Sequence, residues 1–148
     1  MGDDAVRSVS LTRTGPATFV AQNVRGGTIP VGAGAGGKSA FTPVELLLVG
    51  VAGCSGIDID LLTSRLAEPT DLRIVAAGTK LRDADGNHLG PITVTVEVSF
   101  PAGEEGNAAR ERLPGAVAMS RDRLCTVSRT VQLATPVQFV LAPDRHDG

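Results

Sequence analysis

Aromatic side chains are scarce in this chain of 148 residues, which contains four Phe and neither Tyr nor Trp. Proteins that bind single-stranded nucleic acids stack the bases on aromatic side chains, so this mode of binding is excluded. Basic residues are also few, because 14 Lys and Arg are outnumbered by 16 Asp and Glu, for a formal net charge of -2. Without a surplus of positive charge to neutralise phosphates, we expect no nucleic-acid partner.

Long apolar runs are missing as well. The longest uncharged, apolar-rich run covers residues 46–57, which is shorter than the roughly 18 residues that a membrane-spanning helix needs. Residues 1–4 contain neither the basic region nor the apolar region that opens a secretory signal. We therefore expect no membrane partner and a cytoplasmic location.

Cysteine is limited to Cys54 and Cys125. Two cysteines in a reducing compartment do not make a disulfide framework, so each is either a small core residue or a working thiol. Apolar residues make up 42% of the chain and charged residues 20%, which is ordinary usage for a globular protein. This length suits one domain that covers residues 1–148.

Alternating polar and apolar residues, turn residues and apolar spacing predict the order of the elements. In chain order we expect strands at residues 5–13, 18–24 and 28–31, a helix at 43–66, strands at 72–81 and 92–100 around a hairpin turn at 83–90, helices at 108–121 and 125–133, and a strand at 136–141. Pro114 should kink or restart the helix that contains it. The order βββ-α-ββ-α-α-β predicts an α+β fold with a mostly antiparallel sheet.

The start of the first helix has the clearest local signal. Thr42 stands at the N-cap, Pro43 at the first helical position and Glu45 two positions later, which is a capping box with the favoured proline placement. The helix is apolar on every side, which is typical of a buried central helix. Its interior glycines, among them Gly53 and Gly56, indicate that another element approaches closely.

A glycine-rich loop at residues 32–37 matches the pattern GxGxxG. In a dinucleotide-binding fingerprint the helix begins inside the glycines. Here the helix begins only after Thr42, so the pattern favours a flexible loop. Nucleotide binding stays open as a weaker alternative.

Local chemistry ranks the two thiols. Cys54 lies within the apolar helix, and an apolar environment raises the pKa of a thiol. Cys125 opens a predicted helix and has three basic neighbours, Arg121, Arg123 and Arg129. Helix N-termini and cations lower a thiol pKa, so local chemistry favours Cys125 as the thiolate.

Other catalytic and metal-binding patterns are weak. The residues that could bind zinc, Cys54, Cys125, His88 and His146, are scattered along the chain without a close pair, so we expect no metal site. Asp58 and Asp60 are two positions apart on a helix and therefore do not share a face.

Two motifs resemble those of a known family. The segment FTPVELLL at residues 41–48, followed by AGC at residues 52–54, resembles the central-helix motif of the OsmC/Ohr family, named for osmotically inducible protein C and organic hydroperoxide resistance protein. A Cys-x-x-Ser at a helix start is the second family signature, and it matches residues 125–128. The resemblance covers nearly the whole chain, and the predicted element order agrees with it.

The resemblance implies a fold, an assembly and an activity. The fold would be an intertwined homodimer in which sheets sandwich two long central helices. The activity would be thiol-dependent reduction of organic hydroperoxides or hydrogen peroxide, with no cofactor or metal. Cys54 matches the peroxidatic position, where the thiolate becomes a sulfenic acid. Cys125 matches the resolving position, where a disulfide forms that a dithiol reductant, such as a lipoyl group, reduces.

The family activates its cysteine with an Arg–Glu pair, and here the match is incomplete. In the hydroperoxide-resistance branch the Glu directly follows the Pro, whereas this chain has Val44 there and Glu45 one position later. Nine residues of ideal helix place Glu45 and Cys54 on opposite faces, which favours Glu45 as the helix cap. For the cation that stabilises the thiolate we favour Arg25, with Arg13 and Lys38 as alternatives.

One rival function follows from the incomplete pair. Without the activating Glu, the chain could be a non-enzymatic relative: a dimer that binds a small apolar ligand near the central helix. A scaffold with two unreactive buried thiols is the simplest alternative.

Overall fold

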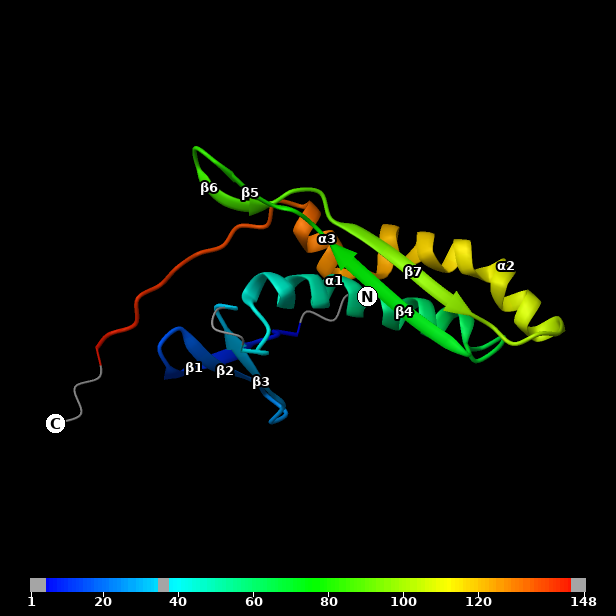
Figure 1. The fold of residues 1–148 in the computed structure, drawn as a ribbon, viewed down its shortest axis with the longest axis horizontal. Helices are drawn as coiled ribbons and strands as arrows, with labels where there is room; N and C mark the ends of the chain where they lie inside the picture. The colour runs from blue at the N-terminus through cyan, green and yellow to red at the C-terminus, as the bar shows by residue number, and fades with distance from the viewer. Residues whose placement is uncertain (1–4, 35–37, 145–148) are drawn as a thin grey trace. The chain divides into compact units, whose positions relative to one another are not determined.

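The computed structural model describes residues 5–34 and 38–144, and it is a mixed α+β structure as predicted (Figure 1). In chain order the elements are β1 (Val9–Gly15), β2 (Thr18–Asn23), β3 (Thr28–Gly32), α1 (Pro43–Thr63), β4 (Asp71–Ala77), β5 (Lys80–Asp83), β6 (Gly86–Leu89), β7 (Thr93–Ser99), α2 (Glu104–Met119), the π-helical segment η1 (Ser120–Leu124) and α3 (Thr126–Gln132).

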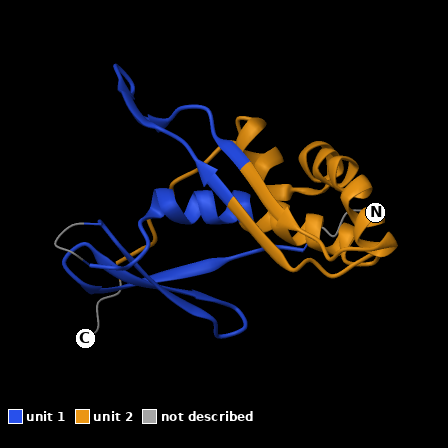
Figure 2. Ribbon diagram, turned by 45° about the vertical axis from the view of Figure 1, so that its right-hand side comes forward, with its two compact units in different colours: residues 1–52, 75–94 blue, residues 53–74, 95–148 orange. Residues whose placement is uncertain are grey.

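The chain divides into two compact units (Figure 2). Unit 1 consists of residues 1–52 and 75–94, and unit 2 of residues 53–74 and 95–148. The division falls inside α1 and inside the paired strands β4 and β7, so these three elements contribute to both units. Both cysteines belong to unit 2.

Unit 1 contains a three-stranded antiparallel sheet in the order β1-β2-β3, which confirms the three strands predicted first. The turn between β2 and β3 is organised by Asn23. Its side-chain oxygen accepts hydrogen bonds from the backbone N–H groups of Arg25 at 3.0 Å and of Gly27 at 2.9 Å. An Asn side chain that bonds to the following backbone is a common way to close a turn, and here it leaves Arg25 exposed at the tip.

The predicted strand at 92–100 is found as β7, and residues 72–77 of the predicted strand at 72–81 are found in its partner β4. The arrows of β4 and β7 run in opposite directions in Figure 1. Residues 80 and 81 belong to β5 instead. The region between β4 and β7 also differs from the prediction. Residues 83–90 are not a simple turn, because β5 and β6 form a second small antiparallel hairpin. The Asp83 carboxylate accepts backbone hydrogen bonds from Asp85 and Gly86, so the tight turn that the sequence indicated occupies only the tip of this hairpin.

Helix α1 begins as the sequence predicts. The Thr42 N–H donates to the Glu45 carboxylate at 2.8 Å, and the Glu45 N–H donates to the Thr42 hydroxyl at 3.2 Å. These hydrogen bonds from Thr42 hold the pKa of the Glu45 carboxyl below its ordinary value. The helix ends at Thr63, three residues before the predicted end at 66. There the N–H of Leu66 bonds to the Thr63 carbonyl in a tighter turn.

Burial of α1 differs from the prediction. Within the chain, only Val51, Ile59 and Thr63 of this helix are buried. Large apolar side chains on other sides are exposed, namely Val44, Leu47, Val49, Ile57 and Leu61. The expectation of burial on every side is therefore wrong for the single chain. Helix α1 is long and apolar enough to cross a bilayer, a criterion that the core helices of soluble proteins also meet. Of its most apolar 18-residue stretch, 17% is buried within this chain.

The glycines of α1 play different roles. A side-chain carbon at Gly56 would lie 2.9 Å from the Cδ1 atom of Ile74 on β4, whereas Gly53 faces open space. The close approach that the sequence predicted is therefore confirmed at Gly56.

The core of unit 2 lies between the end of β7 and α2. Ala67, Phe100 and Ala109 form a buried cluster. Helix α2 runs through Pro114 without the predicted restart. Its first turns are held against the strand end, because the Arg110 guanidinium donates to the Phe100 carbonyl oxygen at 2.7 Å. These contacts fix the path of α2 toward its C-terminus, where the cysteine-bearing segment follows.

The predicted strand at residues 136–141 is wrong, because the structure has no regular backbone there. The apolar side chains of this segment are exposed, namely Val137, Phe139, Val140 and Leu141. A strand needs a neighbouring edge to satisfy its backbone hydrogen bonds, and the chain pairs no described edge with this segment.

The capping box should contribute measurably to stability. We expect Thr42→Ala to lower the free energy of unfolding by about 1 kcal/mol, because the N–H of Glu45 loses its acceptor. Thr42→Ser keeps a hydroxyl and should retain most of the stability. Urea denaturation followed by circular dichroism measures both, and a Thr42→Ala protein as stable as the wild type would contradict the role of the cap.

Candidate functional site

The structure brings Cys54 and Cys125 together within unit 2, although they lie far apart in the sequence. Cys54 is half-buried on α1, whereas Cys125 is 2% exposed at the N-cap of α3. Cys125 lies close enough to Cys54 to raise the pKa of its thiol, and both cysteines are free thiols. Two neighbouring thiols of unequal exposure can form a disulfide when an oxidant removes two electrons.

The position of Cys125 depends on the π-helical segment η1. The Cys125 N–H donates to the Ser120 carbonyl at 2.9 Å, a bond that spans five residues. Cys125 itself has extended backbone angles, with φ -74° and ψ 98°. The helical backbone therefore stops at Cys125 and restarts at Thr126 as α3. Single π-helical turns are found disproportionately at functional sites.

The Cys125 sulfur accepts two hydrogen bonds. The Ser128 N–H donates to it at 3.4 Å, so the thiol acts as the N-cap of α3. The Ser55 hydroxyl donates to it at 3.7 Å from α1. These donors come from two different elements, and they hold the buried sulfur in one place.

The Cys54 thiol has competing neighbours. Burial raises the pKa of this thiol, and the adjacent Cys125 sulfur raises it further. Two backbone N–H groups at the start of α3, those of Val127 and Thr126, act in the opposite direction and lower the pKa. The pKa stays above its ordinary value, so Cys54 is held mainly as the thiol at neutral pH.

A polar contact lies beside the two thiols. The Ser120 hydroxyl donates to the Asp58 carboxylate at 2.9 Å, and Ser120 is only 1% exposed. Asp58 is on the same helix as Cys54. This contact joins the start of η1 to α1, five residues before Cys125.

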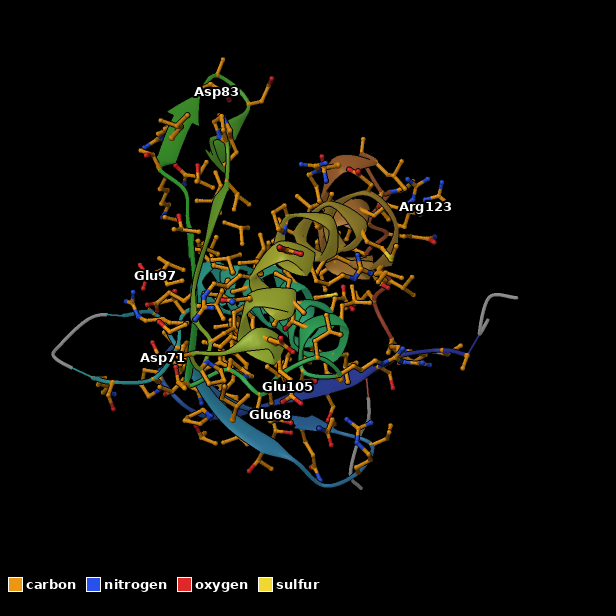
Figure 3. All side chains as sticks on the ribbon, turned by 90° about the vertical axis from the view of Figure 1, so that its right-hand side faces the viewer. Glu68, Asp71, Asp83, Glu97, Glu105 and Arg123 are labelled. Carbon is orange, nitrogen blue, oxygen red and sulfur yellow. The ribbon has the colours of Figure 1, made fainter. Side chains whose placement is uncertain are left out.

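The cations that the sequence placed near Cys125 lie on the surface. Arg121 pairs with Asp122 at 2.8 Å. In Figure 3 the labelled Arg123 points away from the helices, and Arg129 is also exposed. Within residues 38–144 none of these guanidinium groups bonds to a sulfur. The donors at the Cys125 sulfur are instead a backbone N–H and a hydroxyl.

The other two predicted site residues lie in unit 1. Arg25 is exposed in the turn between β2 and β3, and its role as the thiolate-stabilising cation stays a prediction. The Glu45 carboxylate accepts the Thr42 N–H, which confirms the interpretation of Glu45 as the helix cap.

The remaining candidates for metal or nucleotide binding are two histidines and the glycine-rich loop. Across residues 5–34 and 38–144, no three or more His, Cys, Asp and Glu side chains are grouped so that they could hold a metal ion. The His88 ring nitrogen Nδ1 lies 3.5 Å from Asp83 on the β5–β6 hairpin, and His146 lies outside the described residues. Residues 35–37 of the glycine loop also lie outside them.

Ser55, Asp58 and Ser120 contribute to the site, and the sequence reasoning missed them. Asp58 is four positions after Cys54, a spacing that places both on one face of a helix, and this was the available signal. No local pattern marked Ser120, because its partner is 62 positions away.

Comparisons with known proteins give relatives that match most of the chain. The family profile described as "OsmC-like protein" matches residues 35–140. Uncharacterized proteins of Mycobacterium tuberculosis and Mycobacterium bovis are 30% identical over 128 residues, which cover 86% of this chain and 90% of each relative.

Solved structures with a similar fold cover most of both chains. A hypothetical protein from Aquifex aeolicus is 24% identical with a TM-score of 0.69, over 88% of this chain and 90% of that one. An OsmC-like protein of unknown function from Vibrio cholerae is 11% identical with a TM-score of 0.71, over 86% and 94%. A protein from Legionella pneumophila, described as an organic hydroperoxide resistance protein, is 14% identical with a TM-score of 0.59, over 88% and 92%. These likenesses show a shared fold.

The neighbouring sulfur should influence the reactivity of Cys54. In Cys125→Ser we expect the pKa of the Cys54 thiol to fall toward its ordinary value, because the sulfur that raises this pKa has been removed. The serine hydroxyl still provides an N-cap for α3. The rate of alkylation by iodoacetamide, followed by mass spectrometry across neutral and alkaline pH, should reach its midpoint at lower pH. Cys54→Ser serves as the control for any reaction at Cys125. An unchanged midpoint in Cys125→Ser would contradict the influence of the Cys125 sulfur on the pKa of Cys54.

Proposed function

The chain belongs to the OsmC-like protein family, and on that premise we propose that it is a thiol-dependent peroxidase that reduces organic hydroperoxides or hydrogen peroxide. Cys54 is the peroxidatic residue and Cys125 the resolving residue. The enzyme acts in the cytoplasm, without cofactor or metal, and a dithiol of the lipoyl type regenerates it.

The observation that carries the proposal is the pairing of a half-buried thiol with a fully buried one. Cys54 is the more accessible residue of the pair, and Cys125 is near enough to raise the pKa of the Cys54 thiol. A peroxidase of this type needs one thiol that the substrate can reach and a second within bonding distance. The hydroperoxide resistance protein from Legionella pneumophila, which has the same fold, supports this class of reaction.

The first chemical step oxidises Cys54. The Cys54 thiolate attacks the terminal oxygen of the hydroperoxide, a sulfur–oxygen bond forms, and the oxygen–oxygen bond breaks. The departing alkoxide takes a proton and leaves as the alcohol, so the peroxide is reduced while Cys54 becomes a sulfenic acid. Because burial raises the pKa of this thiol, the thiolate needs stabilisation. The N–H groups of Val127 and Thr126 supply part of it, and we assign the remaining positive charge to Arg25.

The second step closes the disulfide. The Cys125 sulfur attacks the Cys54 sulfur, a sulfur–sulfur bond forms, and the hydroxyl group leaves as water with the proton of the Cys125 thiol. A dithiol then reduces the disulfide in two exchange reactions and is itself oxidised to a disulfide. Hydrogen bonds from Ser55 and Ser128 already hold the Cys125 sulfur, so disulfide formation requires little rearrangement of the Cys125 side chain.

The proposed assembly is an intertwined homodimer. Apolar side chains on α1 are exposed in the single chain, Ile57 at 64% and Leu61 at 58%. The irregular segment after α3 also exposes apolar residues, with Phe139 at 93%. Apolar surface of this kind is stabilised when it is covered, and a second copy of the chain would cover both features.

A second candidate function is a non-enzymatic dimer that binds a small apolar ligand near α1. Two observations favour it: Val44 stands where the peroxidase branch has Glu, and the Glu45 carboxylate is occupied by the cap. A hydrophobic molecule that co-purifies, seen by native mass spectrometry, together with cysteines that do not react with peroxide, would select this function.

Peroxide consumption tests the leading proposal. With a dithiol as reductant, we expect the wild type to consume an organic hydroperoxide and Cys54→Ser to lose turnover completely, because the attacking sulfur is gone. Cys125→Ser should retain a single oxidation of Cys54 but lose dithiol-dependent turnover.

Thiol counting separates the two chemical steps. After peroxide treatment and denaturation, the wild type should contain no free thiol. Wild-type protein that keeps both thiols and consumes no peroxide would overturn the proposal. Turnover that is lost only in Cys125→Ser would reassign the nucleophile to Cys125.

The assembly has its own test. We expect sedimentation to give the mass of two chains for the wild type and of one chain for Ile57→Glu, because a charge at this position would be buried in the dimer without a partner. Ala84→Glu, a charge added at the exposed tip of the β5–β6 hairpin, should leave the dimer intact. A wild-type protein that sediments as one chain would contradict the assembly.

A further inference from the structure

The contact between Ser120 and Asp58 is unusual among the buried polar groups of the described residues. Thr63 and Ser120 are the polar residues that are buried there. Thr63 bonds to a carbonyl of its own helix, whereas the Ser120 hydroxyl reaches the Asp58 carboxylate on a different helix. A hydrogen bond to a charged group is stronger than one between neutral groups. This contact therefore restrains η1 against α1 more firmly than apolar packing alone.

Ser120 is also bonded to the backbone of Cys125. Its carbonyl oxygen accepts the Cys125 N–H at 2.9 Å across the π-helical turn. Ser120 is thus held by its side chain on one side and holds the cysteine through its carbonyl on the other. A shift of Ser120 would move Cys125 with it.

Asp58 shares a helix face with the thiol site. Cys54, Ser55 and Asp58 lie within one turn of α1, at spacings of three and four residues that place side chains near one another. The face of α1 that carries Cys54 contacts the segment 120–125 at two residues. Ser55 bonds to the sulfur of Cys125, and Asp58 bonds to the hydroxyl of Ser120, five residues earlier.

We propose that Asp58 is a positioning residue that acts through Ser120 to hold Cys125 against Cys54, and so sets how readily the disulfide closes. The inference rests on the proposed function, in which Cys125 resolves the oxidised Cys54. A disulfide forms only when its two Cα atoms come within a narrow range of distances. Holding the Cys125 sulfur in place near Cys54 raises the effective concentration of one thiol at the other.

A purely structural role for Asp58 would give a different result. If the contact only stabilised the fold, its loss would weaken the reduced and the oxidised protein equally, and the equilibrium between them would not move. A positioning role favours the arrangement in which the sulfurs can join, so its loss lowers the stability of the disulfide relative to the dithiol. The redox equilibrium therefore distinguishes the two roles.

The experiment measures this equilibrium without peroxide. Diamide oxidises the two thiols to the disulfide by taking up their two hydrogen atoms. Dithiothreitol then exchanges with the disulfide, giving two protein thiols and oxidised dithiothreitol. The protein is equilibrated at a series of ratios of reduced to oxidised dithiothreitol, and its free thiols are then alkylated. Mass spectrometry of the alkylated protein gives the equilibrium constant for each variant.

We expect Ser120→Ala and Asp58→Ala each to lower the equilibrium constant for disulfide formation about tenfold, the effect of one lost hydrogen bond to a charged group. Asp58→Asn keeps an acceptor without the charge, so its equilibrium constant should lie between those of the wild type and Asp58→Ala. Ser120→Thr keeps the hydroxyl and should stay near the wild-type value. The double variant should match either single variant, because both remove the same contact. Asp122→Ala, in the same segment but paired only with surface arginines, is the matched control.

The outcomes separate this inference from the proposed function. A wild-type protein that forms no disulfide with diamide would overturn both. A wild-type disulfide with an unchanged equilibrium in Ser120→Ala and Asp58→Ala would overturn only the positioning role. Urea denaturation confirms that each variant is folded before it is measured, and loss of the disulfide in Asp58→Asn as severe as in Asp58→Ala would also count against the role.

Discussion

The attachment of η1 to one face of α1 is the constraint on which the thiol site depends. Cys54 is placed by the helix itself, whereas Cys125 lies outside that helix, at the junction of η1 and α3. The Asp58 carboxylate holds Ser120, and the Ser120 carbonyl in turn holds the Cys125 N–H. Because both bonds lie in buried or half-buried surroundings, water competes poorly with them. The two sulfurs therefore meet in the folded chain without any cross-link.

This placement has an electrostatic cost for Cys54. The same packing that brings a second sulfur close also buries the first, and both effects raise the pKa of the Cys54 thiol. Backbone N–H groups at the start of α3 offset part of that increase. In the proposed peroxidase a reactive Cys54 needs further positive charge, which we assign to Arg25.

Local signals predicted several elements and missed others for physical reasons. The start of α1 was predicted correctly, because Thr42 and Glu45 satisfy each other within three residues. Strand β7 was predicted from the alternation of polar and apolar residues, a pattern that needs no knowledge of the partner strand. The strand expected at residues 136–141 was wrong, because a strand exists only beside an edge that accepts it. Burial of α1 was overestimated, because an apolar helix indicates that something covers it but not that the same chain does.

The sequence by itself determined the helix that carries Cys54, the capping role of Glu45, the mixed α+β class and the resemblance of the two cysteine motifs to one family. Only the tertiary structure decided which groups surround each sulfur. Ser55, Asp58 and Ser120 could not be assigned from local patterns, because hydrogen bonds between residues about 60 to 70 positions apart depend on how helices pack rather than on local spacing. Helix starts and strand alternation are decided by neighbours along the chain, whereas a thiol site is decided by neighbours in space.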